Sequence, residues 1–356
     1  METVRGNDKT RRGRLATRLR ELARVCLLPA TLVAQVREEQ GEREVLLGGQ
    51  AVIEGVLMRA PRSYCVAVRT RRGIVQKREG LTRPQDRWRG WRLPGLRGLA
   101  TLGQSLALGL AALRFSANVA LEDESQATGL SRAEPREKNQ EMPGWLLGVQ
   151  VAFSLLFFIF LYKYVPLVAA TALERRGLAG GWLGFNLIDG LVRIALFLAF
   201  VGLTALWRDI RRVYEYHGAE HMVVYTWEAG RPVSIENARA FRPEHPRCGT
   251  SFLLVVLLVS LVVYALIPVH QFAPRLLVRI LLLPVIAGVS YEIIRAAGRN
   301  PASAFWRAAV TPGLWLQRLV TTRQPADDQL EVAIRALEGA LEVERAADEP
   351  VPATVN

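Results

Sequence analysis

Long apolar runs dominate the second half of the chain and are separated by shorter polar stretches. Four of them lie near residues 145–170, 182–207, 250–268 and 276–293. Each run holds about as many apolar residues as a helix needs to cross the hydrocarbon core of a bilayer. The pattern therefore predicts a mainly α, polytopic membrane protein with four transmembrane helices in a membrane domain at 144–295.

A fifth apolar stretch, at 96–120, contains Gln104 and many small residues. Its weaker hydropathy is typical of a helix that lies in the membrane interface or packs against other helices. We expect an apolar or interfacial helix here rather than a full span.

The preceding segment, 45–95, has the period-two pattern of strands. Tyr64–Thr70 and Ile74–Glu79 are short β-like runs on either side of an Arg-Arg-Gly turn at 71–73, which predicts a hairpin. Together with a polar loop at 208–249, this segment is expected to form a small α/β cytoplasmic part.

Polar segments complete the expected organisation. They are a basic N-terminal tail at 1–44, a flexible linker at 121–143, cytoplasmic C-terminal helices at 296–345 and a tail at 346–356. In the C-terminal helices, Leu330, Ile334, Leu337 and Leu341 recur at helical spacing. Such a stripe packs on the rest of the protein or on a partner.

The formal net charge of +13 is concentrated near the N-terminus. Residues 1–97 contain 22 Lys/Arg and 10 Asp/Glu, an excess of +12. No zinc-finger, homeodomain or RNA-binding signature accompanies this charge, so it favours the cytoplasmic flank of membrane helices over nucleic-acid binding. Three widely spaced cysteines fit reduced thiols. We expect a multi-pass protein of the inner (plasma) membrane, with both termini cytoplasmic and the lipid bilayer as its partner.

Two ionisable residues lie inside the second apolar run. Asp189 and Arg193 are four residues apart, so they can neutralise each other on one helix face. Because unpaired charge in hydrocarbon is costly, an internal ion pair is the favoured interpretation. A transport pathway that uses these two residues with Glu292 is the alternative.

The candidate chemistry is concentrated in residues 214–251, which hold three of the four histidines. His217, Glu220 and His221 form the pattern His-x-x-Glu-His. On a helix, the two histidines would lie on one face and could bind a single metal ion. The same order occurs in one class of zinc peptidase, in which the glutamate activates water.

A catalytic zinc needs a third protein ligand and an open position. His245, Cys248 and Glu292 are the candidates for that ligand. Cys248 stands just before the third apolar run, where the N–H groups of a helix N-terminus favour a thiolate. Glu220 is then the candidate general base, with Glu54 and Glu292 as supporting acids.

Several ungapped stretches resemble the YqhQ-like family of bacterial membrane proteins. They are GGQAVIEGVLMRAP at 48–61, YHGAEH at 216–221, HPRCGTSF at 245–252, PVIAGVSYEIIR at 284–295 and PGLWLQRLVTTRQPADDQLEVAIRAL at 312–337. Members of the family carry a domain of unknown function and are often labelled predicted metal-dependent enzymes. The resemblance therefore implies a membrane protein of this kind from about Leu46 to Leu337.

Taken together, the motif and the resemblance favour a metal-dependent membrane enzyme, a hydrolase that works at the cytoplasmic membrane face with a divalent metal ion such as zinc. Two alternatives stay open. One is a non-enzymatic membrane scaffold with a structural metal or a partner-docking loop, and the other is a small transporter. The sequence names no substrate and leaves open whether the protein is a homo-oligomer.

Overall fold

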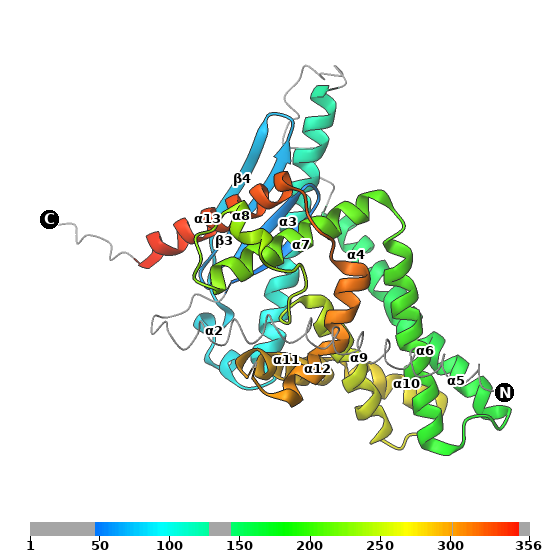
Figure 1. The fold of residues 1–356 in the computed structure, drawn as a ribbon. Coiled ribbons are helices and arrows are strands. Elements are labelled where there is room, and N and C mark those ends of the chain that lie inside the picture. The colour runs from blue at the N-terminus through cyan, green and yellow to red at the C-terminus, as the bar shows by residue number, and fades with distance from the viewer. Residues whose placement is uncertain (1–46, 128–143, 301, 349–356) are drawn as a thin grey trace, which may run out of the picture.

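A computed structural model describes residues 47–127, 144–300 and 302–348 of the chain. The basic tail expected at 1–44 and most of the linker expected at 121–143 lie outside the described residues. The described part is mainly helical and contains one antiparallel sheet (Figure 1).

The sheet has four strands in the order β1-β2-β3-β4. These are β1 (Gly48–Val52), β2 (Gly55–Arg59), β3 (Ser63–Thr70) and β4 (Gly73–Gly80). The hairpin expected from the sequence is confirmed: Thr70 pairs with Gly73 across the β3–β4 turn. Gly73 has a φ of 132°, a conformation that side chains with a Cβ rarely adopt, so the glycine suits this turn.

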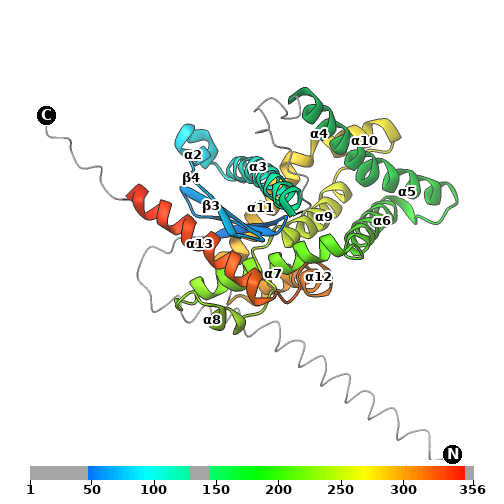
Figure 2. The ribbon, with the colours of Figure 1, turned by 90° about the horizontal axis from the view of Figure 1, so that it is seen from above.

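Helices cover both faces of the sheet (Figure 2). On one face lie α7 (Arg208–Glu228) and α13 (Asp327–Asp348), which share an apolar core with the strands. On the other face, α3 (Leu96–Ala127) contributes Leu108 and Ala112. The leucine stripe of the C-terminal helix therefore packs on this protein's own sheet.

Strand β3 contributes side chains to the apolar cores on both faces of the sheet. Cys65 and Ala67 join the core under α7 and α13, whereas the alternating residues Tyr64, Val66 and Val68 join the core under α3. Successive side chains in a strand point to opposite faces. Because both faces are covered, the strand is apolar at each position from Tyr64 to Val68.

The remaining helices form an apolar bundle beside the sheet (Figure 1). They are α4 (Gly144–Ile159), η3 (Phe160–Tyr164), α5 (Val165–Arg175), α6 (Gly181–Thr204), α9 (Gly249–Ala265), α10 (Phe272–Leu281), α11 (Leu283–Arg299), α12 (Ala304–Leu316) and η4 (Gln317–Thr321). Short elements α2 (Pro84–Arg87), η1 (Arg89–Arg92) and α8 (Ile235–Arg239) lie in the connections.

The candidate membrane spans differ from the four that we expected. Among the described residues, the helices long and apolar enough to cross a membrane are Leu96–Ala127, Ala152–Arg175 and Gly181–Thr204. The run expected at 276–293 is instead a pair of helices, α10 and α11, bent by 45°. Counting that pair as one span gives up to four. The run expected at 250–268 is α9, whose 17 residues make it a shorter apolar helix.

Helix α3 is the main correction to the expected organisation. We expected an apolar or interfacial helix at 96–120; α3 begins where expected but has 32 residues and continues through Ala127 into the expected linker. One side of it covers the sheet, while Leu106 on another side is 76% exposed. Its apolar residues therefore have two different environments, which the sequence pattern does not distinguish.

Candidate metal centre

Helix α7 places His217 and His221 on the same face, with their ring centroids 4.3 Å apart. The helix runs without a break through Gly218. A Cβ at Gly218 would clash with the carbonyl oxygen of Arg323. The glycine therefore lets the backbone that follows η4 approach α7 closely.

That close approach fixes the ring of His217. The backbone N–H of Arg323 donates to the carbonyl of Tyr214 at 3.0 Å, which ties the two segments together. The carbonyl of Thr321 lies 2.7 Å from Nδ1 of His217. Since a carbonyl can only accept, Nδ1 carries the proton and Nε2 points to the other side of the ring.

His221 is oriented in the same way by a different segment. Its Nδ1 lies 2.5 Å from the carbonyl oxygen of Pro243, in the loop before α9. A backbone carbonyl that accepts from the second ring nitrogen is the usual support for a histidine metal ligand. Both imidazoles therefore present Nε2 to a common space.

Cys248 supplies the third donor atom. It is the N-cap of α9, and its Sγ accepts from the backbone N–H of Thr250 at 3.3 Å. The same sulfur lies 3.2 Å from Nε2 of His217. The ligand atoms of His217, His221 and Cys248 all lie within 4.8 Å of one another.

The charges of these groups are coupled. Burial raises the pKa of the Cys248 thiol, but the imidazoles of His217 and His221 outweigh burial and bring the pKa well below its usual range. Burial lowers the pKa of His217, yet Cys248, Glu220 and the Thr321 carbonyl together raise it to about 9. Cys248 and His217 thus stabilise each other's charged form: the thiol becomes more acidic and the imidazole more basic because each faces the other.

Glu220 lies beside this cluster. One of its carboxylate oxygens is 3.3 Å from Nε2 of His221, and both side chains are buried. A Cβ at Gly49 of β1 would clash with the Glu220 side chain. The absence of a side chain at Gly49 thus makes room for the carboxylate, a role for this glycine that the sequence pattern did not predict.

His245 is close to the cluster but is not part of it. Its Nδ1 accepts from the backbone N–H of Arg247 at 3.3 Å, and its Nε2 lies 3.4 Å from a carboxylate oxygen of Glu228. Its ring centroid is 5.5 Å from that of His221. Burial lowers the pKa of His245 to about 4. Both ring nitrogens are already engaged, so the structure favours Cys248 over His245 as the third donor.

Gln317 is a supporting residue that sequence reasoning missed. It lies in η4, a π-helical turn, and hydrogen-bonds the backbone of His245 and the hydroxyl of Ser251. Residue Thr321 at the end of the same turn accepts from His217. π-helical turns occur frequently at functional sites, where they re-aim side chains and carbonyls. The signal available in the sequence was the stretch at 312–337 that carries the family resemblance.

The structure does not bring Glu54 and Glu292 to the cluster. Glu54 sits in the β1–β2 turn with a φ of 52°, where it pairs with Arg212 and accepts from the hydroxyl of Tyr216. Glu292 pairs with Arg97 at the contact between α11 and α3, and accepts from the backbone N–H of Gly95 at 3.2 Å. Both carboxylates therefore join elements of the fold.

One of the three donor separations is close to the value expected around a small divalent ion. Around a tetrahedral zinc, ligand atoms at about 2.0–2.3 Å from the ion lie roughly 3.3–3.6 Å from each other. The 3.2 Å separation of Sγ and Nε2 is close to this range. Two imidazoles and a thiolate are also ligands that zinc prefers. Residues His217, His221 and Cys248 would hold such an ion.

Comparisons with known proteins agree with the sequence motifs. Residues 93–343 match a family described as "Protein of unknown function (DUF1385)". The chain is 31% identical over 310 residues to "Uncharacterized protein YqhQ" of Bacillus subtilis (strain 168), a match that covers 85% of this chain and 94% of that protein. No solved structure matches the chain. The protein described here belongs to the YqhQ-like family of proteins with a DUF1385 region.

Proposed function

We propose that this protein is a metal-dependent membrane enzyme, a hydrolase that acts at the cytoplasmic membrane face. The observation that carries the proposal is the convergence of His217, His221 and Cys248, whose ligand atoms lie within 4.8 Å of one another, with Glu220 alongside. Three protein donors with an adjacent carboxylate are the residue types that catalytic zinc sites use.

Each residue has a defined task in this proposal. His217 and His221 are held by backbone carbonyls, so their Nε2 atoms are pre-oriented. The imidazoles of His217 and His221 hold the pKa of the Cys248 thiol well below its usual range, and the backbone N–H of Thr250 donates to its Sγ. A divalent ion bound here would lower the pKa of water and polarise a carbonyl or phosphoryl group. Glu220 would accept the proton of the attacking water and return it to the leaving group.

The membrane location rests on the apolar helices and on the charges beside them. Cys248 is the N-cap of α9, and α7 follows the end of α6 after three residues, so the centre lies near the ends of two apolar helices. Arg208, Arg211 and Arg212 stand in the first two turns of α7. Basic residues at helix ends favour the cytoplasmic side.

The metal content of purified full-length protein tests the first half of the proposal. We expect about one equivalent of zinc in the wild type, and its loss in His217→Ala and Cys248→Ala. His270→Ala is the matched control, because His270 is the exposed fourth histidine and should leave the metal content unchanged. His245→Ala should also retain metal. Equal metal content in the wild type and in both ligand variants would overturn the centre.

The variant Glu220→Gln tests the second half of the proposal, the hydrolase activity. This variant should keep its metal and lose about 10²–10⁴-fold in turnover of any chromogenic ester, amide or phosphodiester that the wild type cleaves. Unchanged turnover in Glu220→Gln would show that Glu220 is not the general base and would overturn the hydrolase proposal.

A structural metal is the second candidate, because the site is tightly enclosed. His221 is 3% exposed and Cys248 is 6% exposed, and structural sites are closed whereas catalytic sites keep an open position. This candidate predicts that a fourth protein ligand completes the coordination. X-ray absorption of the metal-loaded protein distinguishes the two: a light-atom ligand that exchanges with added azide or imidazole supports the enzyme.

A further inference from the structure

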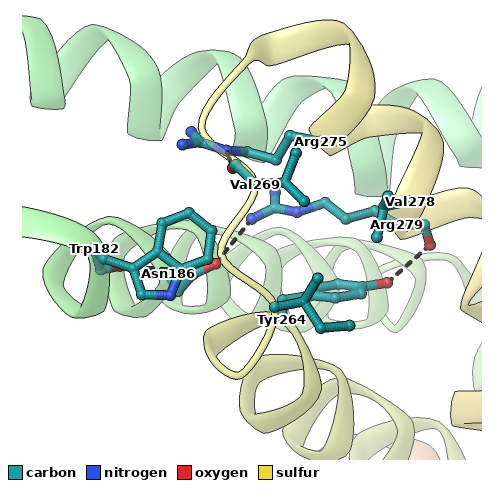
Figure 3. Close-up of a pocket in the computed structure, with 8 residues that line it drawn as sticks. Trp182, Asn186, Tyr264, Val269, Arg275, Val278 and Arg279 are labelled. Atoms are coloured by element: carbon teal, nitrogen blue, oxygen red, sulfur yellow. Dashed lines mark hydrogen bonds between the residues drawn. The ribbon is translucent and has the colours of Figure 1, made fainter.

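The charged side chains inside the apolar bundle are engaged with one another. Asp189 and Arg193 of α6 form the expected ion pair at 2.5 Å, and Arg279 of α10 binds the other carboxylate oxygen of Asp189. The amide oxygen of Asn186 accepts from Nη2 of Arg279 at 3.2 Å, and the hydroxyl of Tyr264 donates to the carbonyl of Arg279 at 3.0 Å (Figure 3). Backbone groups that face no other strand lie elsewhere, at one edge of the sheet.

The hydrogen bonds around β2 show which backbone groups of the sheet face which neighbour. At one end of β2, the carbonyl of Glu54 accepts from the N–H of Arg69 at 2.8 Å. At the other end, the N–H of Ala60 donates to the carbonyl of Ser63 at 3.0 Å. Residues of a strand in an antiparallel sheet direct their N–H and C=O groups to alternate sides. The even-numbered residues of β2 therefore face β3, and its odd-numbered residues face β1.

Strand β1 is an edge strand, so its outward groups face no further strand of the sheet. The odd-numbered residues of β2 pair with Gly48, Gln50 and Val52. Gly49 and Ala51 therefore each direct one N–H and one C=O away from the sheet. Among the described residues, no backbone hydrogen bond joins these groups to another element. Gly48, Gly49 and Gln50 are exposed and Ala51 is half-buried, so the edge is open to solvent.

This edge lacks the charged side chains that commonly protect edge strands from pairing with other chains. The opposite edge of the sheet, β4, carries Lys77, Arg78 and Glu79. By contrast, β1 has the sequence Gly-Gly-Gln-Ala-Val. Nothing lies within 4 Å of a Cβ at Gly48, and Gly49 also has no side chain. Another extended chain could therefore approach β1 without a steric or charge barrier.

The edge of β1 also lies against the candidate metal centre. A Cβ at Gly49 would lie 2.5 Å from Cγ of Glu220. The carboxylate of Glu220 is in turn 3.3 Å from Nε2 of His221. Glu220 is only 5% exposed, whereas Gly49 above it is exposed. A strand added to a sheet lies about 4.8 Å from its neighbour. A chain paired with Gly49 would therefore pass beside the residue assigned as general base.

We propose that the free edge of β1 binds an extended polypeptide segment by strand addition, and that such segments are the substrate class of the hydrolase. The N–H and C=O groups of Gly49 and Ala51 match the alternating main-chain groups of another extended chain. Lipids and nucleotides offer no such alternation. Hydrolysis would break one amide C–N bond, with the hydroxyl of water joining the carbonyl carbon and its proton passing through Glu220 to the amine. The substrate role rests on the proposed function, whereas the binding mode does not.

Fluorescence anisotropy with full-length protein in neutral detergent tests the strand addition. The protein carries Glu220→Gln, so that a bound peptide is not cleaved. The probe is a labelled pool of capped octapeptides of randomised sequence. Its control is the same pool N-methylated at every internal amide, which removes the main-chain donors and keeps the side chains. We expect saturable binding of the first pool and binding about tenfold weaker for the methylated pool.

A proline substitution in β1 tests the same edge from the protein side. Ala51→Pro should weaken binding about tenfold, because proline removes the outward N–H and is tolerated in edge strands. Gln76→Pro in β4 is the matched control. Gln76 pairs with Ala67, whose backbone faces β2, so the N–H of Gln76 also faces outward but at the edge away from Glu220. This control should bind the peptide pool as the parent protein does.

The outcomes separate this proposal from the hydrolase proposal. Peptide binding without cleavage by the wild type would keep the docking edge and overturn the hydrolase together with the substrate role. Cleavage of a small chromogenic ester without peptide binding would keep the hydrolase and overturn strand addition. Equal binding of the two pools would overturn it even if Ala51→Pro fails to fold, and so would a folded Ala51→Pro that binds like its parent. A dimer in light scattering that Ala51→Pro dissociates would assign the edge to a second copy of this chain instead.

Discussion

Gln317 and the backbone of His245 hold each other through two hydrogen bonds. The amide oxygen of Gln317 accepts from the His245 N–H at 2.7 Å, and its amide nitrogen donates to the His245 carbonyl at 2.9 Å. The same nitrogen donates to Ser251 at 2.8 Å. One side chain of η4 therefore fixes the loop that precedes Cys248.

We expect Gln317→Ala to loosen this loop and weaken the centre without touching a ligand. Two buried backbone groups lose their partners, at a cost of about 1–3 kcal/mol each in unfolding free energy. Metal affinity should fall about 10–100-fold, as it does when the support of a ligand is removed. Competitive zinc titration measures the affinity. Gln271→Ala, an exposed glutamine, is the control. Unchanged affinity in Gln317→Ala would show that the loop holds its position without Gln317.

Gly218→Ala should displace the segment that orients His217. The added Cβ would meet the Arg323 carbonyl, and backbone cannot move aside as a flexible side chain can. Overpacking of this kind costs about 1–3 kcal/mol in unfolding free energy. Gly103→Ala is the control, because nothing lies within 4 Å of a Cβ there and alanine is the better helix former. Thermal unfolding should therefore shift in opposite directions for the two variants.

Parts of the centre were predictable because they depend on local chemistry. The spacing of His217 and His221 predicts one helix face, and the position of Cys248 before an apolar run predicts a helix N-cap. Gln317 was not predictable in the same way, since it acts on His245 across 72 residues of sequence. The role of Gly49 was not predictable either, because it depends on the packing of β1 against Glu220.

The expected membrane helices show a different limit. The pattern of apolar residues in the sequence is the same whether they face lipid or cover a sheet. It therefore did not predict the full length of α3. The bend between α10 and α11 had a local signal, because Pro284 stands in the first turn of α11. A proline lacks the N–H that a continuous helix needs and disfavours helical geometry in the residue before it.

Glu54 should be dispensable for the metal centre. Its pair with Arg212 is partly exposed, with side-chain exposures of 31% and 45%, and such pairs contribute about 0–1 kcal/mol. Glu54→Gln should therefore keep its metal content and lose at most that much stability. A double-mutant cycle with Arg212→Gln measures the coupling between the two. Loss of metal in Glu54→Gln would show that this carboxylate supports the metal centre after all.

Asp189→Asn should be strongly destabilising, because it removes the carboxylate that Arg193 and Arg279 share. Breaking a buried ion pair from one side costs about 3–5 kcal/mol. Asp209→Asn, an exposed carboxylate in the first turn of α7, is the control. Thermal unfolding in detergent measures the difference. A stable Asp189→Asn that loses ion flux in proteoliposomes would instead support a transport pathway through this residue.

Removal of bound metal should lower the stability of the wild type more than that of Cys248→Ala. The ligands come from two elements: His217 and His221 from α7, which packs on the sheet, and Cys248 from the start of α9 in the apolar bundle. An ion that binds only the folded protein stabilises it by mass action, about 4 kcal/mol at a thousandfold excess over its dissociation constant. A chelator should therefore lower Tm in the wild type, re-addition of zinc should restore it, and Cys248→Ala should respond to neither. An equal response of the two proteins would mean that the ion stabilises the fold from another position.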